Sequence, residues 1–132
     1  MAVQPFDWSK YFELAGTLGK STDHASLRTS ISRAYYYVFH LARARAVKNG
    51  YKHQTGTNTG SHKQLWQAYE SCPEPDAIRL HEIALRMKKN RERADYEDSF
   101  ARIADEVPAA LKDAQNFDII LKRLPARLPA VR

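Results

Sequence analysis

The sequence predicts an all-α bundle within one domain, and two observations carry that prediction. Apolar residues recur at spacings of three and four through most of the chain, and no stretch shows the sustained two-residue alternation of a half-buried strand. Helix-capping residues, glycines and prolines fall between the periodic segments, where helices begin and end. A length of 132 residues is typical of a single domain. We expect that domain to span residues 1–124, followed by a flexible basic tail at 125–132.

Five helices are expected, and local signals mark their ends. Their approximate ranges are 7–18, 24–49, a short helix at 62–72, 77–93 and 105–123. The expected N-caps are one of residues 21–23, then Ser61 and Asp76. Gly50 is expected to close the second helix, and Pro108 falls in the first turn of the last, where proline is tolerated. The segment 51–60 is rich in Thr and Gly, which predicts a mobile loop.

The second predicted helix is the centre of the bundle, because it is apolar around most of its circumference. One face carries Leu27, Ile31, Ala34 and Val38. Tyr35, Tyr36, Phe39 and Ala46 add apolar surface on other sides. The remaining side is a polar stripe at helical spacing. It consists of Arg33, Tyr37, His40 and Ala44.

Composition narrows the classes of function only a little. The chain holds 21 Lys and Arg against 15 Asp and Glu, and its net charge of +6 suits an anionic partner such as RNA or DNA without requiring one. A single cysteine, Cys72, has no internal disulfide partner and favours a reducing compartment. There is no signal-peptide pattern and no apolar run of the ~20 residues that cross a bilayer. We expect a cytoplasmic protein that does not bind membranes.

The most basic segment, residues 86–93, carries five cations and one acid. Arg91 continues the apolar face of Leu80, Ala84 and Met87, so it is predicted to point into the fold. The remaining cations are predicted to bind RNA, or alternatively to form an ordinary solvated helix face that complements the helix dipole. They are Arg86, Lys88, Lys89 and Arg93.

Three strings in fixed order resemble a known family. They are SRAYYYVFH at 32–40, SHK at 61–63 and RERADY at 91–96. Together they resemble the HEPN domain superfamily, and within it the small stand-alone proteins. The resemblance implies an antiparallel up-and-down four-helix bundle with an additional short helix, often assembled as a homodimer. It also implies a metal-independent ribonuclease that needs no cofactor. Many such proteins are toxins controlled by a nucleotidyltransferase antitoxin.

The catalytic signature of that family is an arginine followed after four to six residues by a histidine. Arginine binds the scissile phosphate, and histidine moves protons at neutral pH. No histidine follows Arg91 or Arg93; Asp95 and Tyr96 stand in its place. Arg33 and His40 have the required spacing on the second predicted helix. The predicted catalytic set is therefore Arg91, Asp95, Tyr96, Arg33 and His40, with no metal ligand.

Each of these residues also has a structural interpretation. His40 can be a hydrogen-bonded core histidine, and Arg91 can form an inward ion pair with Asp95. The leading hypothesis is a HEPN-type ribonuclease, the toxin of a toxin–antitoxin pair. The alternative is a non-catalytic dimeric module that binds RNA, a nucleotide or a nucleotidyltransferase partner. A helical DNA binder is a third interpretation, but the chain lacks a short helix-turn-helix with a glycine turn.

Overall fold

The computed structural model describes residues 4–125, and all regular secondary structure in that range is helical. The helices are α1 (Ser9–Leu18), α2 (His24–Lys48), α3 (Ser61–Ser71), α4 (Pro75–Tyr96) and α5 (Ile103–Arg123). The all-α prediction is confirmed. Of the predicted tail at 125–132, only Pro125 lies within the described residues.

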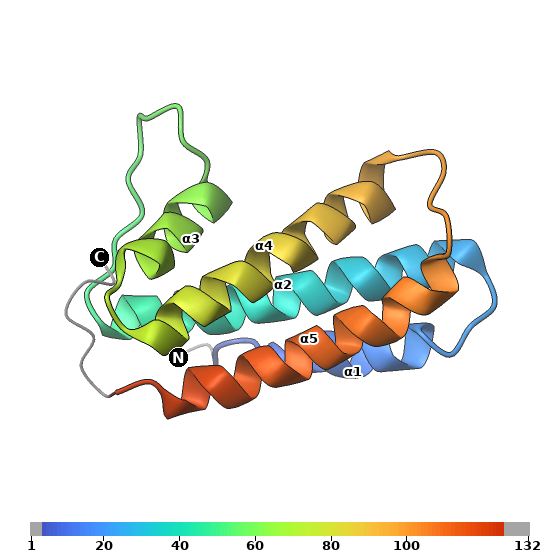
Figure 1. Ribbon diagram of the computed structural model, residues 1–132, viewed down its shortest axis with the longest axis horizontal. Helices are drawn as coiled ribbons and strands as arrows, with labels where there is room; N and C mark the ends of the chain where they lie inside the picture. The colour runs from blue at the N-terminus through green and yellow to red at the C-terminus, as the bar shows by residue number, and fades with distance from the viewer. Residues whose placement is uncertain (1–3, 126–132) are drawn as a thin grey trace.

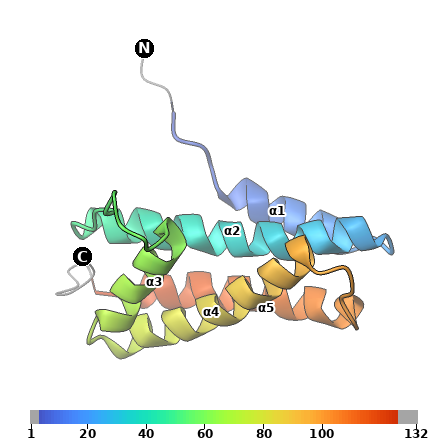
Figure 2. The same ribbon diagram turned by 90° about the horizontal axis from the view of Figure 1, so that it is seen from above.

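Four helices of the bundle, α1, α2, α4 and α5, are antiparallel from one to the next (Figure 1). α1 runs toward one end, α2 returns, α4 runs out again and α5 returns, whereas the short α3 lies beside the first turns of α4 (Figure 2). α2 contacts each of the other four helices, as expected for its apolar circumference. The structure is thus an antiparallel four-helix bundle with an additional short helix.

The ends of the helices agree with the predicted signals in some places and correct them in others. Asp23 is the N-cap of α2, and its side chain accepts a hydrogen bond from the Ser26 N–H at 3.2 Å. Ser61 is wrong as a cap: it is already helical, and Gly60 holds the cap position. Asp76 is also wrong, because Pro75 begins α4 one residue earlier. A proline suits that position since its φ angle is preset and its missing N–H would have no helical partner.

The last two helices extend further than their periodicity indicated. α4 continues three residues past Arg93 to Tyr96. α5 begins at Ile103, so Pro108 lies in its second turn and not in its first. Arg102 precedes α5 in a left-handed conformation with φ of 59°. That sharp turn starts the helix before the expected residue, and nothing in the apolar spacing signals it.

The junction after α2 is a glycine turn that fixes the loop toward α3. Gly50 has φ of 93°, a conformation that glycine adopts without steric cost. Its N–H donates to the Val47 carbonyl at 3.1 Å, and the Tyr51 N–H donates to the Ala46 carbonyl at 3.0 Å. This is the Schellman arrangement, in which the residue after the glycine packs back on the helix. Tyr51 is accordingly buried.

All five helices contribute to the core, and two of its polar side chains are hydrogen-bonded to backbone carbonyls of neighbouring helices. Tyr69 of α3 is buried and donates to the Ala42 carbonyl of α2 at 2.7 Å, while burial raises its pKa. Ser30 of α2 donates to the Ala15 carbonyl of α1 at 2.7 Å. Among the described helices, none has the length and apolar character needed to span a bilayer.

Candidate functional site

Arg91 lies on the inward face of α4, as its spacing predicted. The residue is 8% exposed. Its guanidinium carbon is 5.3 Å from the ring centre of Tyr35 and 5.6 Å from that of Tyr36, both on α2. Aromatic faces at this distance attract a cation, and the attraction grows when water is excluded. The aromatic residues of α2 therefore form one wall around Arg91.

The guanidinium of Arg91 is poorly satisfied for a buried charge. Its nearest carboxylate oxygens belong to Asp95, at 3.7 Å, and Glu92, at 3.9 Å. Both separations exceed a hydrogen bond, and the Arg91 side chain makes no hydrogen bond with any residue in 4–125. Its Nε atom is buried without a partner. Asp95 also accepts from the Ser32 hydroxyl of α2 at 3.3 Å. Arg91 thus retains donors for an incoming anion.

Arg33 approaches the same tyrosine from α2. Its guanidinium carbon lies 5.0 Å from the ring centre of Tyr36 and 4.7 Å from that of Tyr11 on α1. Arg33 forms no ion pair or hydrogen bond with another described residue. Tyr36 therefore lies next to two guanidinium groups, and only Arg91 has carboxylates within 4 Å. The guanidinium group is well suited to bind a phosphate.

His40, two turns further along α2, is held by stacking. Its ring and that of Trp8 are parallel within 2°, with centroids 3.4 Å apart. Burial lowers the pKa of His40, and the charges of Arg43 and Arg33 lower it further. No hydrogen bond joins its ring nitrogens to the part of the chain that the structure describes. His40 is thus a neutral imidazole at neutral pH with free ring nitrogens.

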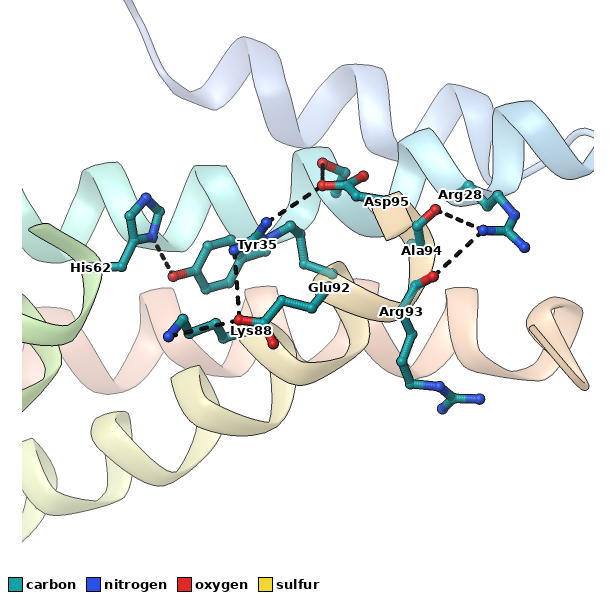
Figure 3. A network of polar contacts seen from close by, with 10 residues as sticks. Arg28, Tyr35, His62, Lys88, Glu92, Arg93, Ala94 and Asp95 are labelled. Carbon is teal, nitrogen blue, oxygen red and sulfur yellow. Dashed lines mark hydrogen bonds and ion pairs between the residues drawn. The ribbon is translucent and has the colours of Figure 1, made fainter. Parts of the chain in front are cut away.

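His62 of α3 lies beside Tyr35 of α2 (Figure 3). Its Nδ1 atom lies 2.6 Å from the Tyr35 hydroxyl, and its ring stacks on Phe39 at 3.9 Å. Trp66 donates its indole N–H to the same hydroxyl at 3.0 Å. An indole N–H can only donate, so the Tyr35 oxygen accepts from Trp66, and the proton of its hydroxyl is available for His62 Nδ1. When the hydroxyl donates to Nδ1, neutral His62 carries its proton on Nε2.

The charge state of this pair follows from burial. Burial raises the pKa of Tyr35 to about 12, so its hydroxyl keeps its proton. Burial, with the charges of Arg91 and Lys88, lowers the pKa of His62 to about 4. His62 belongs to the resemblance string at 61–63 but was not predicted as a site residue. Only tertiary packing places it near Tyr35, 27 residues away in sequence.

The outer cations of α4 have different surroundings. Arg86 forms two hydrogen bonds with Asp113 of α5, at 2.7 and 3.0 Å. Lys88 lies 3.7 Å from Glu92. Arg93 lies 3.7 Å from Glu97 and 4.1 Å from the Phe100 ring centre. Lys89 and Tyr96 are exposed, Tyr96 by 76%.

A surface depression of about 520 Å³ joins several of these predicted residues. Its lining consists of Lys89, Arg91, Glu92, Arg93, Tyr96 and Glu97. The depression holds three cations and two carboxylates, so its charge is largely balanced. Arg86 and Lys88 are not part of it, nor are Arg33 and His40 from α2.

Arg28 is a further residue at this end of the bundle that the sequence patterns did not indicate. From α2 it donates to the backbone carbonyls of Ala94 at 2.9 Å, Glu97 at 2.6 Å and Asp98 at 3.1 Å. These include carbonyls that the end of α4 leaves without helical partners (Figure 3). Arg28 therefore fixes the turn of α4 that carries Asp95.

Within residues 4–125, no group of three or more His, Cys, Asp or Glu side chains is placed to hold a metal ion.

Comparison with known proteins agrees with the fold and with the strings at 32–40, 61–63 and 91–96. A family model described as the HEPN domain matches residues 17–124, which is most of the chain. The protein therefore belongs to the HEPN domain family. No curated protein and no solved structure matches the chain.

Proposed function

We propose that this HEPN protein is a ribonuclease that cleaves RNA without a metal ion, with Arg91 as its main phosphate-binding residue. The observation that carries the proposal is the state of Arg91: a nearly buried guanidinium with no hydrogen bond to a described residue and a second arginine across Tyr36. A buried cation with free donors is costly unless something binds it. A phosphate would supply the missing acceptors.

The proposed chemistry assigns phosphate binding to the two arginines and proton transfer to His40. Arg91 and Arg33 would hold the phosphate oxygens and stabilise the charge that develops on them. His40, neutral and with free nitrogens, would take the proton of the RNA 2′-hydroxyl as its oxygen attacks phosphorus. The resulting imidazolium would return that proton to the departing 5′-oxygen. The products would be a 2′,3′-cyclic phosphate and a 5′-hydroxyl end.

His62, Asp95 and Tyr96 have supporting roles in this proposal. His62 offers an Nε2–H donor and is too weak a base to compete for the proton. Asp95, 3.7 Å from the Arg91 guanidinium, partly neutralises its charge and competes with the phosphate. Tyr96 is exposed beside the depression and is suited to contact RNA.

The test is cleavage of single-stranded RNA by purified protein in the presence of EDTA. Arg91→Ala is expected to lower the cleavage rate at least about tenfold, the typical effect of removing a positioned charged donor. Arg86→Ala, which removes a cation of the same helix outside the site, serves as the control. Intact RNA after long incubation at high protein concentration would exclude the ribonuclease.

A second candidate is a non-catalytic module that binds RNA, a nucleotide or a nucleotidyltransferase partner. Two observations favour it: no histidine follows Arg91 on α4, and His62, whose pKa the Arg91 charge lowers, already has Nδ1 in contact with the Tyr35 hydroxyl. In this case RNA binds without being cut. Binding would weaken steeply with salt, because cations released from RNA drive phosphate contacts.

The family resemblance supports a further part of the proposal, that the protein is a toxin and acts as a cytoplasmic homodimer. Expression from an inducible promoter should then arrest growth, and co-expression of a nucleotidyltransferase encoded beside it should restore growth. Sedimentation of the purified protein should give twice the chain mass of 15.1 kDa. Normal growth despite high expression would contradict the toxin role.

A further inference from the structure

A second concavity lies where the end of α2, the following loop and the start of α3 meet. Its volume is about 210 Å³. The glycine turn at Gly50 brings Tyr51 into its wall, beside Phe39 of α2 and Leu65 of α3. These three side chains are all buried and form an apolar floor.

The rim of this pocket is polar and carries positive charge. His40, Arg43 and His53 line it, and the lining contains no carboxylate. Arg43 makes no ion pair or hydrogen bond with residues 4–125, and neither does the His53 side chain. The charge of Arg43 lowers the pKa of both His40 and Tyr51, although burial keeps the pKa of Tyr51 raised. The rim therefore offers a guanidinium and two imidazoles with no internal anion.

Size and lining together define a class of ligand. Pockets for drug-sized molecules enclose roughly 300–1,000 Å³. This one is smaller and suits a single planar ring. Aromatic walls favour stacking with a heteroaromatic ring, and an unpaired arginine favours a phosphate. A nucleotide unit combines both features.

The pocket adjoins the candidate site through two residues. His40 belongs to both, and the Phe39 ring that lines the pocket stacks on His62 at 3.9 Å. We propose that this pocket binds one unpaired nucleobase of the RNA, with the neighbouring phosphate at Arg43. The proposal rests on the proposed action on RNA, and it makes the substrate single-stranded, because a base within a duplex is stacked and cannot enter.

The test uses the full chain and four probes measured by calorimetry: uridine 5′-monophosphate, adenosine 5′-monophosphate, uridine and inorganic phosphate. At least one monophosphate should bind more tightly than either uridine or phosphate. Arg43→Gln should weaken that binding at least about tenfold, the effect of losing one charge-assisted contact. Lys20→Gln removes one exposed charge in the turn between α1 and α2 and should change binding less than about twofold.

Tyr51→Leu separates the base contact from the phosphate contact. It removes the ring but keeps an apolar side chain, so monophosphate binding should fall while phosphate binding stays unchanged. Thermal melting of each variant verifies the fold. If inorganic phosphate binds as tightly as the nucleotides, or if Arg43→Gln leaves monophosphate binding unchanged, the proposal that this pocket binds a nucleobase is wrong.

Cleavage of RNA is measured on the same preparations, so that the two proposals fail separately. If RNA is cleaved but duplex and single strands are cut equally and no monophosphate binds, the pocket is wrong and the ribonuclease stands. If monophosphates bind through Arg43 and RNA stays intact, the ribonuclease is wrong and the pocket stands.

Discussion

Arg86 and Arg91 lie five residues apart on α4 and differ in almost every physical respect. Arg86 is more than half exposed and forms two hydrogen bonds with Asp113, which raise its pKa. Arg91 is nearly buried, lies against two tyrosine rings and makes no hydrogen bond within residues 4–125. The well-bonded arginine is the one that water could have satisfied. The poorly bonded one is the one that water barely reaches.

The comparison distinguishes an arginine that joins two helices from an arginine that is available to bind a ligand. An exposed, bidentate pair such as Arg86 and Asp113 joins α4 to α5 and leaves few donors free. A buried guanidinium without hydrogen bonds lowers stability, and such a cost is typical of a residue kept for binding. The basic segment 86–93 therefore combines a structural arginine, Arg86, with a candidate binding residue, Arg91.

Replacing Arg91 by methionine should produce the largest effect. RNA cleavage or binding should fall at least about tenfold, because the phosphate loses its main donor. The free energy of unfolding should stay unchanged or rise by about 1 kcal/mol, since an apolar side chain replaces a buried charge whose carboxylate contacts are longer than hydrogen bonds. Urea denaturation gives the stability. A large loss of stability would show that Arg91 is scaffold and would remove the contrast with Arg86.

The reach of the Arg91 charge is tested by the titration of His62. Burial is the main cause of its low pKa and Arg91 the next, so Arg91→Met should raise the pKa of His62 from about 4 toward its ordinary value. Arg86→Met should leave it unchanged. Imidazole resonances followed by NMR between pH 3 and pH 8 measure both. Equal titration curves in the two variants would contradict the placement of Arg91.

The same pKa predicts how stability depends on pH. The pKa of His62 is near 6.5 in the unfolded chain and about 4 in the folded protein. The unfolded state therefore binds more protons between these values, and stability falls as pH drops through that window. His62→Gln should lose this part of the pH dependence, whereas His53→Gln, at an exposed position, should retain it. Thermal melting at pH 7 and pH 4.5 measures the difference.

Asp95→Asn should change RNA binding by less than Arg91→Met does, and it should strengthen binding where Arg91→Met weakens it. Removing the carboxylate charge at 3.7 Å leaves Arg91 less neutralised, while the amide can still accept from Ser32. RNA affinity should increase by about twofold to fivefold, the range of an exposed ion-pair energy. Fluorescence anisotropy with labelled RNA measures it. Weaker binding would indicate that Asp95 orients Arg91 more than it competes with phosphate.

The smallest effect is expected at Arg86. A double-mutant cycle of Arg86→Met and Asp113→Asn should give a coupling energy of about 0.5 kcal/mol, as for exposed pairs. RNA cleavage by both single variants should match that of the unaltered protein. A tenfold loss on mutation of Arg86 would place the functional surface on the outer face of α4.

Helical periodicity and caps determined much of this protein from sequence alone. They predicted the all-α fold, the central position of α2, a cap among residues 21–23, the end at Gly50 and the inward direction of Arg91. All of these depend on residues within a few positions of one another. The physical reason is that helix register and termination are local properties of the chain.

Contacts between helices were decided only by the tertiary structure. Residue spacing predicts none of three contacts seen here: the hydrogen bond between His62 and Tyr35, the contact of Arg28 with the end of α4, and the pairing of Arg86 with Asp113. Each joins residues 27 or more positions apart. Periodicity shows which face of a helix is buried, but the packing of whole helices selects the side chains that meet there. Sequence therefore determined that Arg91 points inward, and packing surrounded it with tyrosine rings and left its donors free.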